Sequence, residues 1–263
     1  MSRSVRLPAN GFKAALRGNR KQIGLWTSLC SNIVAELVGD TGFDWVVLDT
    51  EHAPNEPADI LAQLQAMQGG TAEPVVRPPA SDVVMIKRVL DVGARTLLIP
   101  FVQDAAEAAA AVAATRYPPA GIRGVSTAPR ANRYGRVAGY HGAASDDICV
   151  IVQLESGSAL TRLEAIAAVE GVDALFIGPS DLAADLGHLG DSAHPEVQEA
   201  IADGCRRSLA AGRPIGILAP IEADARRYFE MGFSFVAIGS DVGVLASGCA
   251  GLLSRMQAAI GSD

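Results

Sequence analysis

The chain has 263 residues, of which 49% are hydrophobic and 19% are charged, and its formal net charge at pH 7 is −7. This composition is sufficient for one large α/β domain, and the negative charge gives no support to binding of a nucleic-acid backbone. The sequence has no apolar run long enough to span a bilayer and no apolar signal-peptide core, so we expect a cytoplasmic protein without membrane contacts.

Short apolar runs of β-type composition recur along the chain, and segments of helical periodicity separate them. This alternation predicts a parallel sheet whose strands are buried on both faces. Eight such runs fit a (β/α)8 TIM barrel that forms a single domain over residues 1–263. The predicted strands are 22–28, 44–49, 73–78, 95–100, 148–155, 174–179, 214–219 and 235–240. The predicted helices are 57–67, 81–93, 105–116, 159–171, 195–212 and 222–232.

A doubly wound open sheet is the alternative fold for the same alternation. That fold expects a glycine-rich loop after its first strand, and the stretch LWTSLCSN at this place contains no glycine. The barrel is therefore favoured.

Two segments depart from the repeat. Residues 116–147 are rich in Gly, Pro and Arg and only weakly periodic, which is typical of a functional loop, and we expect them on the catalytic face of the barrel. Residues 241–260 form a final helical pattern with an apolar surface. This surface predicts packing on the barrel or on a neighbouring subunit.

Polar side chains follow several of the predicted strands. Because active sites of (β/α)8 barrels lie where the strands end, these side chains are expected to converge on one rim. They are Asp49, Glu51 and His52 after the second strand, Arg77 at the third, Gln153 and Glu155 at the fifth, Ser180 and Asp181 after the sixth, and Asp241 after the eighth.

Glu155 and Asp181 come from neighbouring strands. Two carboxylates without a nearby His or Cys suit a hard divalent cation such as Mg²⁺ or Mn²⁺, which would act as a Lewis acid. For either carboxylate alone, a helix N-cap or a salt bridge at the rim is the alternative, and capping is the specific alternative for Asp181 in GPSDLAADLG.

Arg77 lies between β-branched residues and prolines in VVRPP, so its buried guanidinium needs an anion. That anion is Asp49 or Glu51, or else a carboxylate or developing oxyanion of a substrate, and the two interpretations are compatible. His52 directly follows a strand beside carboxylates, which favours a general base over a structural histidine.

The positions of lysine and cysteine restrict the chemistry. A Schiff-base aldolase needs a desolvated lysine near the reacting carbonyl, so carbonyl chemistry here would depend on a metal. All three lysines lie outside the predicted strands: Lys13, Lys21 and Lys87. The four cysteines are far apart and are expected to be buried free thiols: Cys30, Cys149, Cys205 and Cys249.

Several blocks of the sequence resemble the HpcH/HpaI aldolase family over about residues 22–245: LDTEHAPN, VVRPP, IKRVLDVGARTLLIP, RYPPAGIRGV, VQLES, GVDALFIGPSDLAADLG and HPEVQEAI. The resemblance implies a class II aldolase that reversibly cleaves a 4-hydroxy-2-oxo acid, of the 2-keto-3-deoxy sugar acid or 4-hydroxy-2-oxoheptanedioate type. The products would be pyruvate or hydroxypyruvate and an aldehyde. It further implies a divalent cation (Mg²⁺, Mn²⁺ or Co²⁺) and a homohexamer in which paired subunits exchange their C-terminal helices.

The same resemblance assigns roles to residues of the reaction centre. His52 matches the catalytic base, and Asp91, in VLDVG, matches the carboxylate that makes this histidine more basic. Arg77 matches the residue that stabilises the enolate, and Glu155 and Asp181 match the metal ligands.

Four further matches concern the substrate pocket. Gln153 and the backbone around Ser180 match contacts to pyruvate, although the family often has alanine in place of this serine. Trp26 and Leu218 match residues that line the pocket. Two other functions stay open: a CoA-ester lyase of the citrate lyase beta-subunit type, and a barrel that binds a small acid without catalysis.

Overall fold

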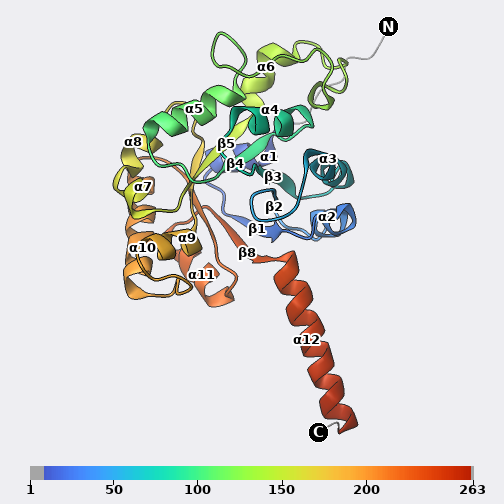
Figure 1. Ribbon diagram of the computed structural model, residues 1–263, viewed down its shortest axis with the longest axis vertical. Coiled ribbons are helices and arrows are strands. Elements are labelled where there is room, and N and C mark those ends of the chain that lie inside the picture. Colours follow the sequence, from blue (N-terminus) through green and yellow to red (C-terminus); the bar gives the residue numbers. More distant parts are fainter. Residues whose placement is uncertain (1–8, 262–263) are drawn as a thin grey trace.

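The computed structural model describes residues 9–261 and has eight parallel strands in a closed barrel (Figure 1). Each strand pairs with the next, and β8 closes the sheet on β1, which excludes the open doubly wound sheet. Because the strands are parallel, their carboxyl ends open on one rim. They are β1 (Gln22–Thr27), β2 (Trp45–Asp49), β3 (Glu73–Arg77), β4 (Thr96–Ile99), β5 (Cys149–Leu154), β6 (Ala174–Ile177), β7 (Ile215–Leu218) and β8 (Phe235–Ser240).

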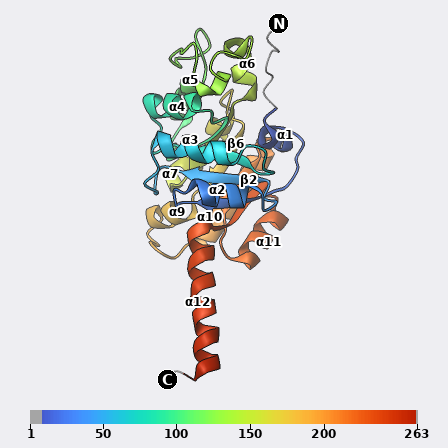
Figure 2. The same ribbon diagram turned by 90° about the vertical axis from the view of Figure 1, so that its right-hand side faces the viewer.

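Helices surround the barrel and connect its strands (Figures 1 and 2). The predicted helix over 159–171 is two short helices, because the backbone of Arg162 (φ −106°, ψ 13°) leaves the helical region between them. The helices are α1 (Gly11–Arg17), α2 (Asn32–Gly39), α3 (Pro57–Ala66), α4 (Val83–Asp91), α5 (Ala105–Thr115), α6 (Tyr140–Asp147), α7 (Gly157–Thr161), α8 (Leu163–Ala167), α9 (Pro179–Asp185), α10 (Pro195–Ala210), α11 (Glu222–Met231) and α12 (Asp241–Ile260), with a 3₁₀ turn at Arg130–Asn132.

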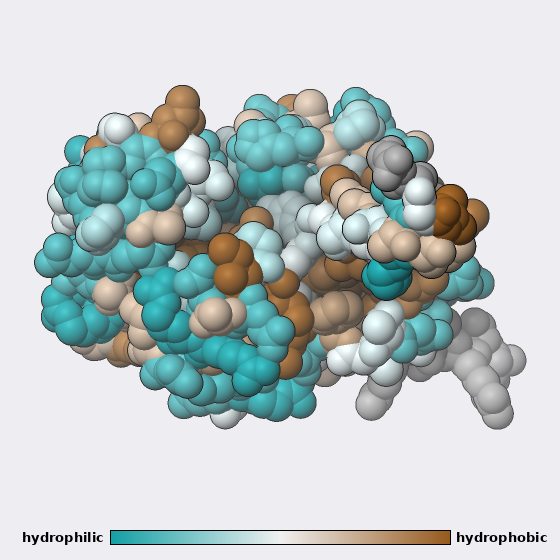
Figure 3. Space-filling view, turned by 90° about the horizontal axis from the view of Figure 1, so that it is seen from below, coloured by the Kyte–Doolittle hydropathy of each residue, from teal (hydrophilic) through white to brown (hydrophobic). Residues whose placement is uncertain are grey.

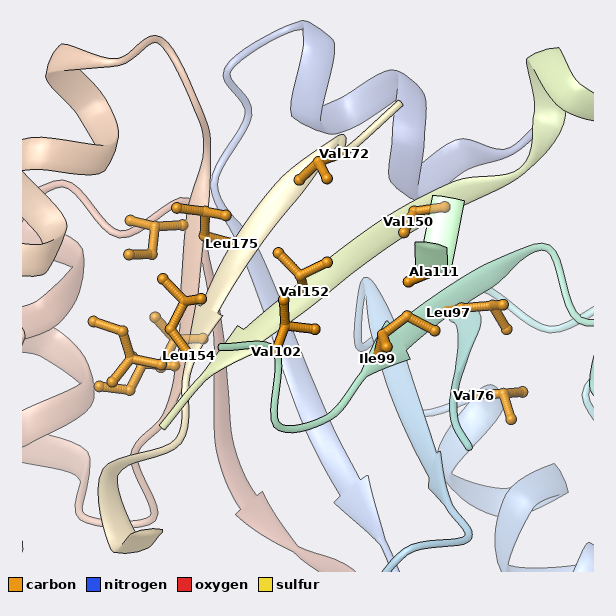
Figure 4. Close-up of a cluster of buried hydrophobic side chains, with 14 of the residues drawn as sticks. Val76, Leu97, Ile99, Val102, Ala111, Val150, Val152, Leu154, Val172 and Leu175 are labelled. Atoms are coloured by element: carbon orange, nitrogen blue, oxygen red, sulfur yellow. The ribbon is translucent and has the colours of Figure 1, made fainter. Parts of the chain in front are cut away.

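The strands bury an apolar layer on each face. The outer layer lies between the strands and the helices, where β-branched and leucine side chains fill the space (Figure 4). The inner layer is rich in aromatic rings, and small residues on adjacent strands make room for them. A Cβ on Gly24 would lie 2.2 Å from the ring of Trp45, and one on Gly216 would lie 2.2 Å from the ring of Phe235.

Helix α1 closes the amino-terminal end of the barrel. Phe12 is fully buried there and meets Trp45 and Phe235 edge to face. The side chain of Lys13 is also buried, with Nζ 2.6 Å from the carbonyl oxygen of Ile148. Lys13 lies in α1 and thus outside the strands, as predicted, and it lies at the end of the barrel opposite the rim, so it is no candidate for a Schiff base.

Residues 116–147 lie at the amino-terminal end of the barrel, and their predicted place on the catalytic face is wrong. The segment follows α5, which has already run back from the rim, and it leads into the start of β5. Arg123 donates to Asp91 at the end of α4 (2.9 Å), and Arg130 donates to the carbonyl of Val92 (2.6 Å). The segment is therefore fastened to the helix end that lies farthest from the rim.

Helix α12 projects from the barrel as an isolated rod (Figures 1 and 2). Its 20 residues span about 30 Å. Asp241 is its only buried residue, so packing of this helix on its own barrel, one of the two expected outcomes, does not occur. Figure 3 views the molecule from the end at which α12 projects and shows hydrophobic residues open to solvent. No helix in residues 9–261, α12 included, combines the length and apolarity needed to cross a membrane.

The four cysteines are free thiols, as predicted, but only two are buried. Cys149 and Cys205 lie in the core, Cys30 is half-buried at the rim, and Cys249 is exposed because it lies on the projecting α12.

Candidate active site

Arg77 ends β3 just below the rim and is 5% exposed. Its Nε and Nη2 donate to the two carboxylate oxygens of Asp49 at 2.8 and 2.6 Å, and its Nη1 lies 2.6 Å from Oε2 of Glu51. The guanidinium stacks 4.7 Å from the ring of Trp26, whose indole N–H donates to Asp49. The predicted ion pair is thus confirmed with both carboxylates. These contacts use three of the five donors of an arginine and leave two for a substrate anion.

Asp49, at the end of β2, is the buried carboxylate that pairs with Arg77. Burial alone would raise the pKa of Asp49, but the hydrogen bonds and charge of Arg77 outweigh it, together with hydrogen bonds from Trp26 and from the amide of Glu51. The net effect lowers the pKa of Asp49. The carboxylate therefore stays ionised and holds the Arg77 fork in a fixed orientation.

Glu155 follows β5 and is held by two donors. Its Oε1 accepts from the backbone N–H of Phe101 at 2.8 Å, and its Oε2 accepts from Nε2 of Gln153 at 2.6 Å. The other amide atom of Gln153, Oε1, is buried without a hydrogen-bond partner. The neighbouring strand end must be small here, because a Cβ on Gly178 would lie 2.4 Å from Oε2 of Glu155.

Three carboxylates share this part of the rim. Burial raises the pKa of Glu155 to about 7, and the negative charges of Asp181 and Glu51 act in the same direction against the hydrogen bonds from Gln153 and Phe101. Burial also raises the pKa of Glu51. The charges of Asp49 and Asp181 raise it further, and those of Arg77 and His52 lower it. Burial is the largest cause at both residues, so a cation bound beside them would favour their ionised forms.

A hard divalent cation fits this group of residues. The buried Glu155, the exposed Asp181 and the unpartnered oxygen of Gln153 offer oxygen ligands, which Mg²⁺ and Mn²⁺ prefer. The N-cap of α9 is Gly178, and Asp181 is in the first turn beyond it, so the capping alternative for Asp181 is wrong.

His52 and Asp91 lie at opposite ends of the barrel. His52 is exposed in the turn between β2 and α3, on the rim beside Glu51. Asp91 ends α4, half-exposed, and pairs with Arg123. Within one chain the structure therefore does not bring Asp91 to His52. A contact between them would require a second subunit.

The remaining predicted pocket residues lie at the rim or just beneath it. Ser180 is exposed in the first turn of α9, and Leu218 ends β7, half-buried against the aromatic layer. Trp26 lies beneath Arg77 and is 6% exposed, so it supports the floor of the site. Two features of this site had no signal in the sequence: the amide of Phe101 as a donor, and the close approach of Gly178.

Two hollows lie at different ends of the molecule. One of about 360 Å³ opens beside Glu51, between residues 79–81 and the turn of Pro100 and Phe101. A larger one of about 720 Å³ lies at the amino-terminal end, against residues 130–148. The smaller hollow adjoins the polar rim through Glu51 and Phe101.

A second group of possible metal ligands lies away from the rim, in the stretch from α9 to α10. His188 contacts Glu196 at 2.9 Å and stacks on the ring of His194. His194 accepts a hydrogen bond from the amide of Glu196 and so caps α10. These contacts give the three side chains a structural role at the start of α10.

The fold and the rim define a (β/α)8-barrel enzyme whose polar site gathers carboxylates around a buried arginine. Residues 22–248 match the family described as HpcH/HpaI aldolase/citrate lyase, and the chain belongs to this family.

Individual relatives agree with this assignment. The chain is 54% identical over 239 residues to 5-keto-4-deoxy-D-glucarate aldolase of Salmonella arizonae, and the aligned region covers 91% of this chain and 93% of that protein. It is 54% identical over 238 residues to the protein of the same name from Escherichia coli, with 90% and 93% covered. A crystal structure of a family member from Burkholderia cenocepacia superimposes with a TM-score of 0.92 at 42% identity, covering 94% of this chain and 99% of that one.

The protein is thus a carbon–carbon lyase. It is a metal-dependent aldolase.

Proposed function

We propose that this aldolase cleaves 5-keto-4-deoxy-D-glucarate. The observation that supports the substrate is the 54% identity over 91% of the chain with an aldolase of that name. Seen as a 2-oxo acid, this substrate carries a hydroxyl on carbon 4 and a carboxylate at each end. The 4-hydroxyl loses its proton, the bond to carbon 3 breaks, and an aldehyde that carries a carboxylate and a hydroxyl leaves. Carbon 3 keeps the electron pair as the enolate of pyruvate and is then protonated.

Glu155 and Asp181 would hold the cation in this proposal. When bound, a divalent cation acts as a Lewis acid that polarises the 2-oxo group. Gln153 and the amide of Phe101 fix the orientation of Glu155. Oε1 of Gln153 has no hydrogen-bond partner and would be available to the cation or the substrate.

Arg77 and His52 would act on the substrate itself. The two free donors of Arg77 stabilise the negative charge that develops on the enolate, and the ion pairs with Asp49 and Glu51 keep the guanidinium in place. His52, exposed at the rim, takes the proton from the 4-hydroxyl. Asp91 would support the His52 of a neighbouring subunit only, because Asp91 and His52 of the same chain lie at opposite ends of the barrel.

The substrate and the metal can be tested in one assay. Protein stripped with EDTA is expected to release no pyruvate from 5-keto-4-deoxy-D-glucarate, and Mg²⁺, Mn²⁺ or Co²⁺ is expected to restore the release, followed with lactate dehydrogenase. A matched substrate, 2-keto-3-deoxygluconate, lacks the second carboxylate and should be cleaved less efficiently. Full activity after chelation would contradict the metal. A preference for the monocarboxylate, or for a malyl-CoA-type thioester, would contradict the proposed substrate.

We further propose that α12 packs on a neighbouring subunit of a homohexamer. Along this helix, Val242, Leu245, Leu252, Met256 and Ile260 recur at helical spacing on one face, and each is 45–71% exposed. A face of this size left in water is rare in a monomer and marks an interaction surface. A second copy of the chain provides an equivalent surface, and exchange of the two helices would cover both.

This assembly predicts a defined response to charge on α12. Leu252→Asp is expected to lower the mass measured by light scattering after gel filtration, because it places a carboxylate in the apolar interface. Ser254→Asp puts the same charge on the opposite face of the helix and serves as the control. An unchanged mass for Leu252→Asp would contradict the interface, provided that circular dichroism shows both variants folded.

A further inference from the structure

Phe101 has a backbone conformation that aromatic residues rarely adopt. Its φ is +53°, in the left-handed region, where a side chain with a Cβ is strained. The residue is 57% exposed, so packing of the side chain does not hold the backbone in this state. Strained backbone of this kind persists where the surrounding structure imposes it, and it gathers at functional sites.

The conformation has a specific consequence at the rim. It turns the N–H of Phe101 toward Glu155, where it donates to Oε1 at 2.8 Å. The other oxygen of Glu155 is held by Gln153, so both oxygens of this buried carboxylate have a fixed donor. A residue at position 101 in the usual β or α region would turn its N–H elsewhere and leave Oε1 without this bond.

The two residues that follow Phe101 are hydrogen-bonded to the end of β5, next to Glu155. The N–H of Val102 donates to the carbonyl of Gln153 at 3.0 Å. The side chain of Gln103 accepts from the hydroxyl of Ser156 at 2.6 Å. The turn after β4 is therefore fixed to the end of β5 at successive residues, and the strain at Phe101 is supported by these bonds.

We propose that Phe101 is a positioning residue, whose left-handed backbone fixes Glu155 in the orientation that binds the divalent cation. This inference rests on the proposed role of Glu155 as a metal ligand. It assigns the function to the backbone of residue 101 and not to its aromatic ring.

A series of substitutions separates the backbone from the ring. Glycine and asparagine tolerate the left-handed region, whereas a β-branched valine resists it, and all three keep the N–H. Metal-stripped Phe101→Gly and Phe101→Asn are expected to bind Mn²⁺ within about twofold of the wild-type affinity, although the ring is lost. Phe101→Val is expected to bind about tenfold more weakly. Isothermal titration with Mn²⁺ alone measures all four proteins without reference to turnover.

Tyr134 provides a matched control in the same chain. It also has a left-handed backbone, at φ +57°, and is 56% exposed, but it lies in the segment at the other end of the barrel. Tyr134→Val should lower the melting temperature and leave the Mn²⁺ affinity unchanged. If Phe101→Val binds Mn²⁺ like the wild type, or if Phe101→Gly binds as weakly as Phe101→Val, the backbone role is wrong. Glu155→Gln separates failure of the positioning role of Phe101 from failure of the proposed metal ligand. If Glu155→Gln also binds Mn²⁺ like the wild type, the assignment of Glu155 as a metal ligand is wrong.

Discussion

Replacing Arg77 by alanine is expected to lower kcat for retro-aldol cleavage about 100- to 1000-fold. Arg77 is the only cation seen to contact the carboxylates of this rim within residues 9–261, and its two free donors face developing negative charge in the proposed reaction. Steady-state release of pyruvate at saturating Mg²⁺ measures the loss. Near-normal kcat in Arg77→Ala would remove this residue from the mechanism.

The same substitution should also destabilise the fold, because it leaves Asp49 buried without its partner. Breaking a buried ion pair costs about 3–5 kcal/mol. Arg77→Lys keeps the charge but not the bidentate fork, so it should recover stability better than activity. The double variant Arg77→Ala with Asp49→Ala removes the unpaired carboxylate and should regain stability without regaining turnover. This contrast separates the catalytic contribution of Arg77 from its structural one.

The ion pair also predicts a dependence of stability on pH. Arg77 lowers the pKa of Asp49 below its ordinary value of 3.8, so the ionised pair stabilises the wild type above that pH. The contribution is lost as the pH falls through the lowered pKa of the folded state. In Arg77→Ala, only the hydrogen bonds from Trp26 and from the amide of Glu51 still oppose the effect of burial on the pKa of Asp49, so the decline of stability in this acid range should be smaller.

The parts of the site that follow strand ends were predictable from the sequence. Continuous apolar runs fix where parallel strands lie, and the residues after them must converge on one rim. For this reason the sequence predicts that Arg77, Glu155 and Asp181 lie on one rim, and it predicts an ion pair of Arg77 with Asp49 or Glu51, which the structure confirms.

Other features depend on three-dimensional relations that no periodic pattern carries. Asp91 matches a family position, but its distance from His52 follows from the direction of α4 and not from the motif. Residues 116–147 were placed on the wrong face because composition shows that a segment is irregular and does not show at which end of the barrel it lies. The left-handed backbone of Phe101 has no sequence signal, since glycine and asparagine are the residues that such a conformation normally selects.

Glu155→Gln is expected to weaken Mn²⁺ binding more than about 100-fold and to abolish cleavage at ordinary metal concentrations. Glutamine fills the same space and still offers an oxygen to the amide of Phe101, so the fold should persist. What is lost is the negative charge of the proposed ligand, which is buried between Gln153 and Gly178. Titration of metal-stripped protein with Mn²⁺ measures the affinity directly. Glu164→Gln, at an exposed carboxylate of α8, is the matched control and should bind like the wild type.

The pH dependence of the same titration identifies the group that binds the cation. Burial raises the pKa of Glu155 to about 7 in the metal-free protein, so a proton competes with the cation below that pH. Mn²⁺ affinity of the wild type should rise up to about pH 7 and then level, whereas Glu155→Gln should lack this rise. Because the folded pKa is above the ordinary value of 4.5, the stability of the metal-free wild type should fall as the pH rises from 4.5 to about 7. The cation reverses that loss by binding the ionised form, and a Glu155→Gln variant with the same pH profile as the wild type would place the metal elsewhere.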